Sequence, residues 1–136
     1  MSGNILVVED NPDNCKLITW ILEDEGYQSV CAASAEKGLE LLNQWNFDLI
    51  LMDISLPGMD GKQAARIIRQ TPKIRDLPII ALTAHAIAGE HELIMAAGMS
   101  DLMTKPLDET KLLKRIAELL HPTHLTGCQS RSQRSI

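Results

Sequence analysis

Residues that could do chemistry together follow the apolar stretches of this 136-residue chain. Glu9 and Asp10 come directly after "ILVV", and Asp53 comes after "LILM". Thr83 follows "PIIAL", and Lys105 follows "LMT". Carboxylates are hard oxygen ligands that suit a divalent cation, and an ammonium group suits an anion such as a phosphoryl group. The set therefore indicates a site that could hold a metal ion and an anion side by side.

The elements that must position these residues alternate along the chain. Short apolar runs predict strands, and stretches with apolar residues at helical spacing predict helices between and after them. Asn11, Ser34 and Asp60 are predicted to cap helices, while Gly26 and Gly98 are predicted to end them. We expect the five strands at 5–8, 28–33, 49–52, 78–82 and 102–104.

Strict alternation of strand and helix predicts βαβ units, hence a doubly wound parallel sheet with helices on both faces. The first, third and fourth strands are the most apolar, so they belong in the middle. With the second strand at an edge, the strand order is 2-1-3-4-5. In such sheets ligands bind outside the carboxyl ends of the strands, where the polar residues named above would meet.

Three carboxylates in one crevice repel one another, because two charges about 4 Å apart cost on the order of 4 kcal/mol at an effective dielectric near 20. Lys105 supplies only one positive charge. The acids therefore predict Mg²⁺, which keeps several waters and shares its shell with phosphate. Asp53 could then act as a carboxylate nucleophile that accepts a phosphoryl group, with Thr83 contacting a phosphoryl oxygen.

Composition excludes several other classes of protein. The net charge of −5 gives no sign of nucleic-acid binding, and no segment reaches the roughly 18 apolar residues of a membrane span. The N-terminus lacks the features of a signal peptide. Cys15, Cys31 and Cys128 are odd in number and widely spaced, which predicts reduced thiols and a cytoplasmic protein. Residues 122–136 are polar and aperiodic, which predicts a disordered tail after a single domain at 1–121.

Four motifs of the chain resemble those of the response-regulator receiver domains of two-component signalling. They are "LVVEDN" at 6–11, "LILMDISLPGMDG" at 49–61, "ALTAHA" at 81–86 and "MTKP" at 103–106. The resemblance covers residues 4 to about 120, with the motifs in the right order and spacing. Within the family, the chain is similar to the stand-alone receivers of chemotaxis and cell division. It implies a flavodoxin-like fold with five helices.

The resemblance also implies roles for individual residues. Asp53 would be the phospho-acceptor, and Asp10 would bind Mg²⁺ directly with help from Glu9. The backbone carbonyl of Ser55 would complete the protein's share of the metal shell. These assignments make Mg²⁺ the expected cofactor.

Further implied roles concern the residues around the phosphoryl group. Thr83 would be the switch hydroxyl, Lys105 would contact the phosphate, and the peptide bond before Pro106 would be cis. Receivers usually carry Tyr or Phe three residues before the lysine, but this chain has Leu102 there. His85 would either face the mouth of the pocket or be an exposed loop residue.

The resulting interpretation is a single-domain response regulator that catalyses only its own phosphorylation and dephosphorylation. A sensor histidine kinase or a phosphotransfer protein would supply the phosphate. A downstream protein would bind the face of the fourth helix, fifth strand and fifth helix, around Ile87 to Leu93 and Leu102. Neither nucleic acid nor a membrane is an expected partner. The start Met and the tail favour a free-standing protein over its alternative, a receiver module of a hybrid histidine kinase in a phosphorelay.

A third class is an aspartate-nucleophile phosphatase, which needs a second aspartate two residues after the nucleophile. Asp53 is followed by Ile54 and Ser55, and Asp10 is followed by Asn11 and Pro12. Neither acid offers the required pair, so this class is disfavoured.

Overall fold

The structure is a computed structural model, and it describes residues 3–84 and 89–121. Five parallel strands form one sheet in the order β2-β1-β3-β4-β5, as predicted for a flavodoxin-like α/β fold. The strands are β1 Asn4–Val8, β2 Gln28–Ala32, β3 Leu49–Asp53, β4 Ile79–Thr83 and β5 Asp101–Thr104. The helices are α1 Pro12–Asp24, α2 Ala35–Gln44, α3 Gly61–Arg69, α4 Glu90–Ala96 and α5 Glu109–Leu120.

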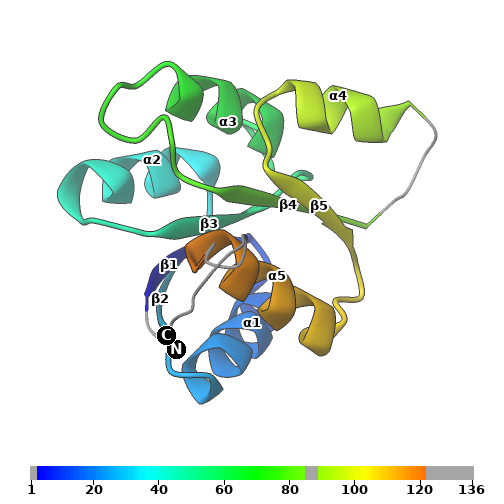
Figure 1. The fold of residues 1–136 in the computed structure, drawn as a ribbon. Coiled ribbons are helices and arrows are strands. Elements are labelled where there is room, and N and C mark those ends of the chain that lie inside the picture. Colours follow the sequence, from blue (N-terminus) through cyan, green and yellow to red (C-terminus); the bar gives the residue numbers. More distant parts are fainter. Residues whose placement is uncertain (1–2, 85–88, 122–136) are drawn as a thin grey trace, which may run out of the picture.

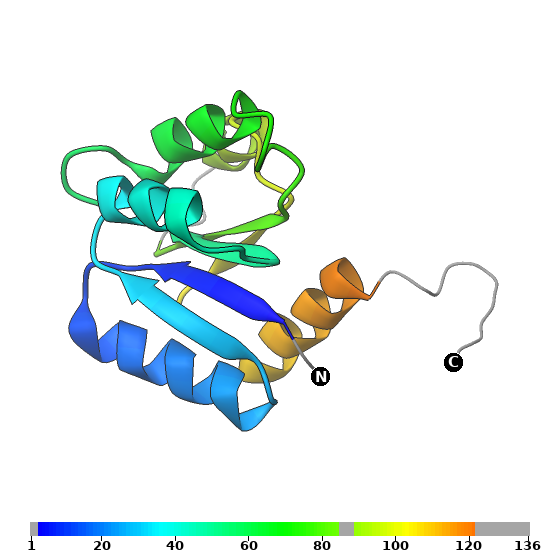
Figure 2. The same cartoon turned by 90° about the vertical axis from the view of Figure 1, so that its left-hand side faces the viewer.

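Helices cover both faces of the sheet (Figure 1), with α2, α3 and α4 on one side and α1 and α5 on the other. The view turned by 90° shows the same three layers (Figure 2). Side chains of the central strands alternate between the two cores, because successive residues of a strand point to opposite faces. In β1, Leu6 and Val8 join the core under α2 to α4, whereas Ile5 and Val7 join the core over α1 and α5.

Helix starts follow the predicted capping residues. The side chain of Asn11 accepts from the backbone N–H groups of Asp13 and Asn14, and the Ser34 side chain accepts from Lys37 N–H. Asp60 forms a reciprocal capping box with Gln63 at the start of α3. These bonds satisfy backbone donors that the first turn of a helix leaves without partners.

Other expectations fall outside the described residues or meet no test. The predicted tail at 122–136 and the residues His85 and Ile87 are among the undescribed parts of the chain. The division into a domain at 1–121 and a tail therefore stays a prediction.

Within residues 3–84 and 89–121, no helix combines the length and the apolar character needed to cross a membrane. The cis peptide bond between Lys105 and Pro106 is present as the resemblance implied.

The prediction of reduced thiols is wrong for two of the cysteines, because Cys15 and Cys31 form a disulfide. Cys15 lies near the start of α1 and Cys31 lies near the end of β2. Their separation of 16 residues along the chain gave no hint of a pair. The connection from α1 back to β2 brings them together, with 6.3 Å between their Cα atoms.

Gly61 allows α3 to begin against the end of β3. A Cβ atom at this position would lie 2.5 Å from the carbonyl oxygen of Asp53 and 3.1 Å from the Cα atom of Ile54. Both of these are backbone atoms, so neither can move aside by changing a rotamer. The close approach links the position of α3 to that of Asp53.

We expect Gly61→Ala to lower the free energy of unfolding by about 1–3 kcal/mol, because the added methyl group must displace backbone. Urea denaturation would measure this. Gly89→Ala is the matched control, since Gly89 has φ 88° but open space around it, and should cost about 1 kcal/mol. A Gly61→Ala protein as stable as the wild type would contradict the close approach.

Candidate functional site

Three acids meet where the carboxyl ends of β1 and β3 lie side by side. Glu9 and Asp10 follow β1, and Asp53 is the last residue of β3. Val8 pairs with Met52 in the parallel register, which brings Glu9 level with Asp53. Carboxylate oxygens of the three acids all lie within 4.8 Å of one another. The crowding expected from the sequence is therefore present.

Lys105 reaches this cluster from the end of β5. Its Nζ atom lies 2.8 Å from Glu9 Oε1 and 3.0 Å from Asp53 Oδ2. Its backbone N–H donates to the carbonyl oxygen of Thr83, at 2.7 Å. One ammonium group thus bridges the two buried acids, since Glu9 is 2% and Asp53 is 3% exposed.

Backbone donors occupy the remaining oxygens of the two buried acids. The N–H of Asn11 donates to Glu9 Oε2 at 3.2 Å, and the N–H of Ser55 donates to Asp53 Oδ1 at 2.9 Å. Every carboxylate oxygen of Glu9 and Asp53 therefore has a donor. Asp10 differs, because its side chain is exposed at the mouth of the cluster.

The electrostatics of the cluster favour an additional cation. Burial raises the pKa of Glu9 above its usual value, hydrogen bonds from Lys105 and Asn11 oppose this, and Asp53 raises it further. Burial lowers the pKa of Lys105, but its hydrogen bonds to Glu9 and Asp53 outweigh burial and leave the pKa raised. The lysine is held in its charged form, while the charged form of Glu9 remains disfavoured.

Thr83 completes the set on the neighbouring strand. It is the last residue of β4, buried at 4% exposure, and follows Leu82, which pairs with Asp53. All the side chains predicted for the site, on Glu9, Asp10, Asp53, Thr83 and Lys105, thus belong to the carboxyl ends of adjacent strands. The role predicted for the Ser55 carbonyl stays a prediction, because the contact seen here is made by its N–H group.

The donor set fits Mg²⁺. All three side chains offer hard oxygen atoms, and one of them, Asp10, is open to solvent and to the waters that Mg²⁺ retains. The shared negative charge exceeds what Lys105 neutralises. The described residues thus form an acidic site suited to a divalent cation.

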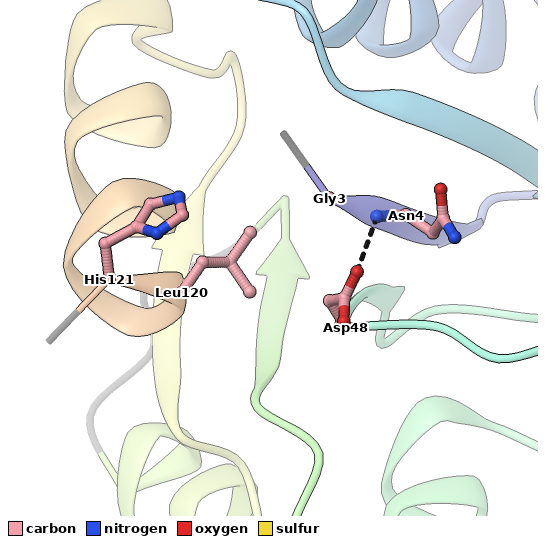
Figure 3. A pocket seen from close by; sticks show the side chains of 5 residues that line it. All are labelled: Gly3, Asn4, Asp48, Leu120 and His121. Atoms are coloured by element: carbon pink, nitrogen blue, oxygen red, sulfur yellow. Dashed lines mark hydrogen bonds between the residues drawn. The ribbon is translucent and has the colours of Figure 1, made fainter. Parts of the chain in front are cut away.

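A hollow at the opposite end of the sheet is separate from this site (Figure 3). It is lined by Gly3, Asn4, Asp48, Leu120 and His121, and the backbone N–H of Asn4 donates to Asp48 Oδ2 at 2.8 Å. These residues lie at the amino ends of β1 and β3 and at the end of α5. The acidic cluster and this hollow are therefore at opposite ends of the same strands.

Sequence reasoning missed the surroundings of Glu9. The Sγ atom of Cys15 lies 3.3 Å from the carbonyl oxygen of Glu9, and the backbone N–H of Asn11 binds the Glu9 carboxylate. A cysteine four residues after a helix cap was a signal for the first contact, because it places the sulfur atom one turn along the helix.

Comparison with known proteins shows the family. The family model for the response regulator receiver domain matches residues 5–117. The chain therefore belongs to the response regulator receiver family.

Among its relatives are both kinases and small regulators. The signal transduction histidine-protein kinase BarA of Shigella flexneri is 46% identical over 112 residues, 82% of this chain but 12% of that kinase. The polar-differentiation response regulator DivK of Brucella ovis is 32% identical over 120 residues, 88% of this chain and 98% of DivK. The chain thus spans 12% of the first kinases that it matches and nearly all of DivK.

A solved structure has the same fold. The receiver domain of the sensor histidine kinase PA1611 from Pseudomonas aeruginosa PAO1 is similar with a TM-score of 0.82 and 37% identity. The similarity covers 88% of this chain and 98% of that one. That receiver has a magnesium ion coordinated in its active site cleft.

We expect Asp10→Ala to raise the free energy of unfolding of the metal-free protein by about 1 kcal/mol, because it relieves repulsion at a solvent-exposed position. It should also weaken Mg²⁺ binding at least tenfold. Thermal unfolding with and without Mg²⁺ would measure both effects. Asp13→Ala is the control with the same charge change, and it should give no stabilisation because Asp13 favours the start of α1. An unchanged or lower melting temperature for Asp10→Ala would contradict the crowding.

Proposed function

We propose that Asp53 accepts a phosphoryl group from a phosphohistidine on a sensor histidine kinase or a phosphotransfer protein. The observation that carries this proposal is the setting of the Asp53 carboxylate. It is buried at a strand end, bound by Lys105 Nζ and Ser55 N–H, and crowded by Glu9 and Asp10. A carboxylate so constrained is a nucleophile held in position.

The proposed cofactor is Mg²⁺, held by Asp10, Asp53, the backbone carbonyl of Ser55 and, through water, Glu9. When bound, it would supply positive charge beside the oxygens of the incoming phosphoryl group. The acidic site described above and the magnesium in the PA1611 receiver support this assignment.

In the transfer, a carboxylate oxygen of Asp53 forms a bond to phosphorus while the bond from phosphorus to the donor imidazole nitrogen breaks. The imidazole keeps the electron pair of that bond and takes a proton from solvent. Lys105, already 3.0 Å from Asp53 Oδ2, balances charge on the phosphoryl oxygens. Positioning and charge neutralisation are the main contributions that a protein makes to this reaction.

The phosphorylated state would be read at the β5 edge of the sheet. The Thr83 hydroxyl would contact a phosphoryl oxygen, and the Lys105 N–H to Thr83 carbonyl bond ties the same strand ends together. A protein target would then bind the face of α4, β5 and α5. On that face Leu93 is exposed and Leu102, in the place of the usual aromatic residue, is partly buried against the core.

The proposed activity is that of a switch, without turnover of an external substrate. The chain would catalyse its own phosphorylation and dephosphorylation and would act as a single-domain regulator. DivK, which this chain matches over 98% of DivK's length, is the relative that supports this form.

Asp53→Asn should abolish labelling by acetyl phosphate in the presence of Mg²⁺, because the amide is too weak a nucleophile. Intact mass spectrometry would measure the added phosphoryl group. Asp60→Asn is the control, since Asp60 is a nearby acid whose capping role asparagine can take over. Undiminished labelling of Asp53→Asn would place the acceptor elsewhere.

A second candidate function is a relay module that passes the phosphoryl group on to a phosphotransfer histidine. The identity with BarA, 46% against 32% with DivK, favours this candidate. These relatives are kinases in which the segment similar to this chain is one part of a longer protein, and this supports a relay module as the alternative.

Phosphorylated chain mixed with a purified histidine phosphotransfer protein distinguishes the two candidates. For the regulator, we expect the label to stay on this chain or to be lost as inorganic phosphate. Transfer of most of the label to the histidine protein within a minute would favour the relay module instead. Gel autoradiography would follow the label on both proteins.

A further inference from the structure

A covalent bond joins two elements that flank the acidic cluster. Cys15 lies near the start of α1, and Cys31 is the fourth residue of β2. Their Cα atoms are 6.3 Å apart, within the range of disulfides in proteins. Cys31 pairs with Val7 in the sheet, two residues before Glu9. The bond therefore ties α1 to the edge strand at the level of the site.

The segment Glu9–Asn11 is attached to both sides of this bond. The Cys15 N–H donates to the carbonyl oxygen of Asn11 at 3.0 Å, and Cys15 Sγ lies 3.3 Å from the Glu9 carbonyl oxygen. On the other side, the Glu9 N–H donates to the carbonyl oxygen of Ala32, the neighbour of Cys31, at 2.9 Å. Two of the three acids thus sit on a segment whose two anchors are joined by the disulfide.

The two cysteines differ in access from solvent. Cys31 is exposed on the edge strand, whereas Cys15 is half-buried between α1 and the Glu9 carbonyl. An oxidant in solution therefore meets Cys31 first, and Cys15 is placed to complete the bond. This division of labour between an exposed and a sheltered cysteine is typical of redox-responsive pairs.

We propose that Cys15 and Cys31 are a reversible oxidation site whose state sets how tightly the acidic cluster binds its cation. The coupling to the cation rests on the proposed Mg²⁺ site, whereas the oxidation itself does not. The oxidant is a hydroperoxide, and the reductant is a dithiol such as a reduced thioredoxin-type protein.

The oxidation balances in two steps. The Cys31 sulfur bonds to one peroxide oxygen and the O–O bond breaks; the departing oxygen leaves as water after taking the thiol proton. The Cys15 sulfur then bonds to the Cys31 sulfur, the S–O bond breaks, and that oxygen leaves as a second water with the Cys15 proton. With hydrogen peroxide, two thiols lose two electrons and two protons, and one peroxide becomes two waters. A dithiol reverses the result by forming its own disulfide.

The disulfide affects the cluster by limiting motion of the Glu9–Asn11 segment. In the reduced protein no cross-link joins α1 to β2 beside this segment, which continues through the chain into α1 and is held to β2 by the hydrogen bond from Glu9 N–H to the Ala32 carbonyl oxygen. In the oxidised protein those two elements cannot separate, so Asp10 loses less freedom when it binds a cation. Preorganisation of this kind raises affinity without any new contact.

The test uses the full chain with Cys128→Ser, which leaves Cys15 and Cys31 as the only cysteines. Hydrogen peroxide should remove two hydrogen atoms from the intact mass and protect both cysteines from alkylation. The oxidised form should unfold at a temperature higher by roughly 10 °C. Mg²⁺ titration should give a dissociation constant at least threefold lower for the oxidised form than for the reduced one.

Two matched variants act as controls, Cys31→Ser and Cys15→Ser, each in the Cys128→Ser chain. Both should show the same Mg²⁺ affinity before and after peroxide treatment. Failure of the folded chain to form the bond would overturn the oxidation site. Bond formation with equal Mg²⁺ affinity in both states, or an equal shift in the serine variants, would overturn the coupling. Absence of Mg²⁺ binding in either state would overturn the coupling as well, and it would count against the proposed cofactor but not against the oxidation.

Discussion

Repulsion among Glu9, Asp10 and Asp53 is the constraint around which the rest of the site is arranged. A single ammonium group, that of Lys105, bridges the two buried acids and leaves the third without an ionic partner among the described residues. The pKa of Glu9 remains raised even with this partner, because burial disfavours its charge. The cluster is therefore stable enough to persist and still short of positive charge. A site with that property is suited to a cation beside an anion, the combination that phosphoryl transfer requires.

The two hydrophobic cores, one on each face of the sheet, explain why the acids do not simply move apart. Glu9 follows β1 and Asp53 ends β3, two strands whose residues are packed on both faces, and a close-packed interior resists displacement. Gly61, which lacks a Cβ atom, lets the start of α3 lie close against the carbonyl group of Asp53. The strand ends are thus fixed by packing at many places away from the charges. Packing of the fold thus keeps the carboxylates close together despite their repulsion. A bound ligand of positive charge could relieve that repulsion.

Much of this arrangement could be predicted from the sequence, because it depends on local patterns. Apolar runs and helical periodicity located all ten elements, and the helix caps at Asn11, Ser34 and Asp60 formed as their side chains dictate. Strand ends differed by one residue, so that Asp53 and Thr83 belong to β3 and β4 themselves. Hydrogen bonds to neighbouring strands extend both strands through these polar residues. A pattern of apolar residues cannot predict this extension.

The sequence by itself determined the order of the elements and the acids, hydroxyl and lysine at the strand ends. Only the tertiary structure decided which oxygen of each acid receives Lys105, which acid stays exposed, and that Cys15 meets Cys31. Those features depend on distances across the sheet and between helix and strand. Such distances are set by how each helix packs against the sheet. The types and spacing of residues along the chain do not give these distances.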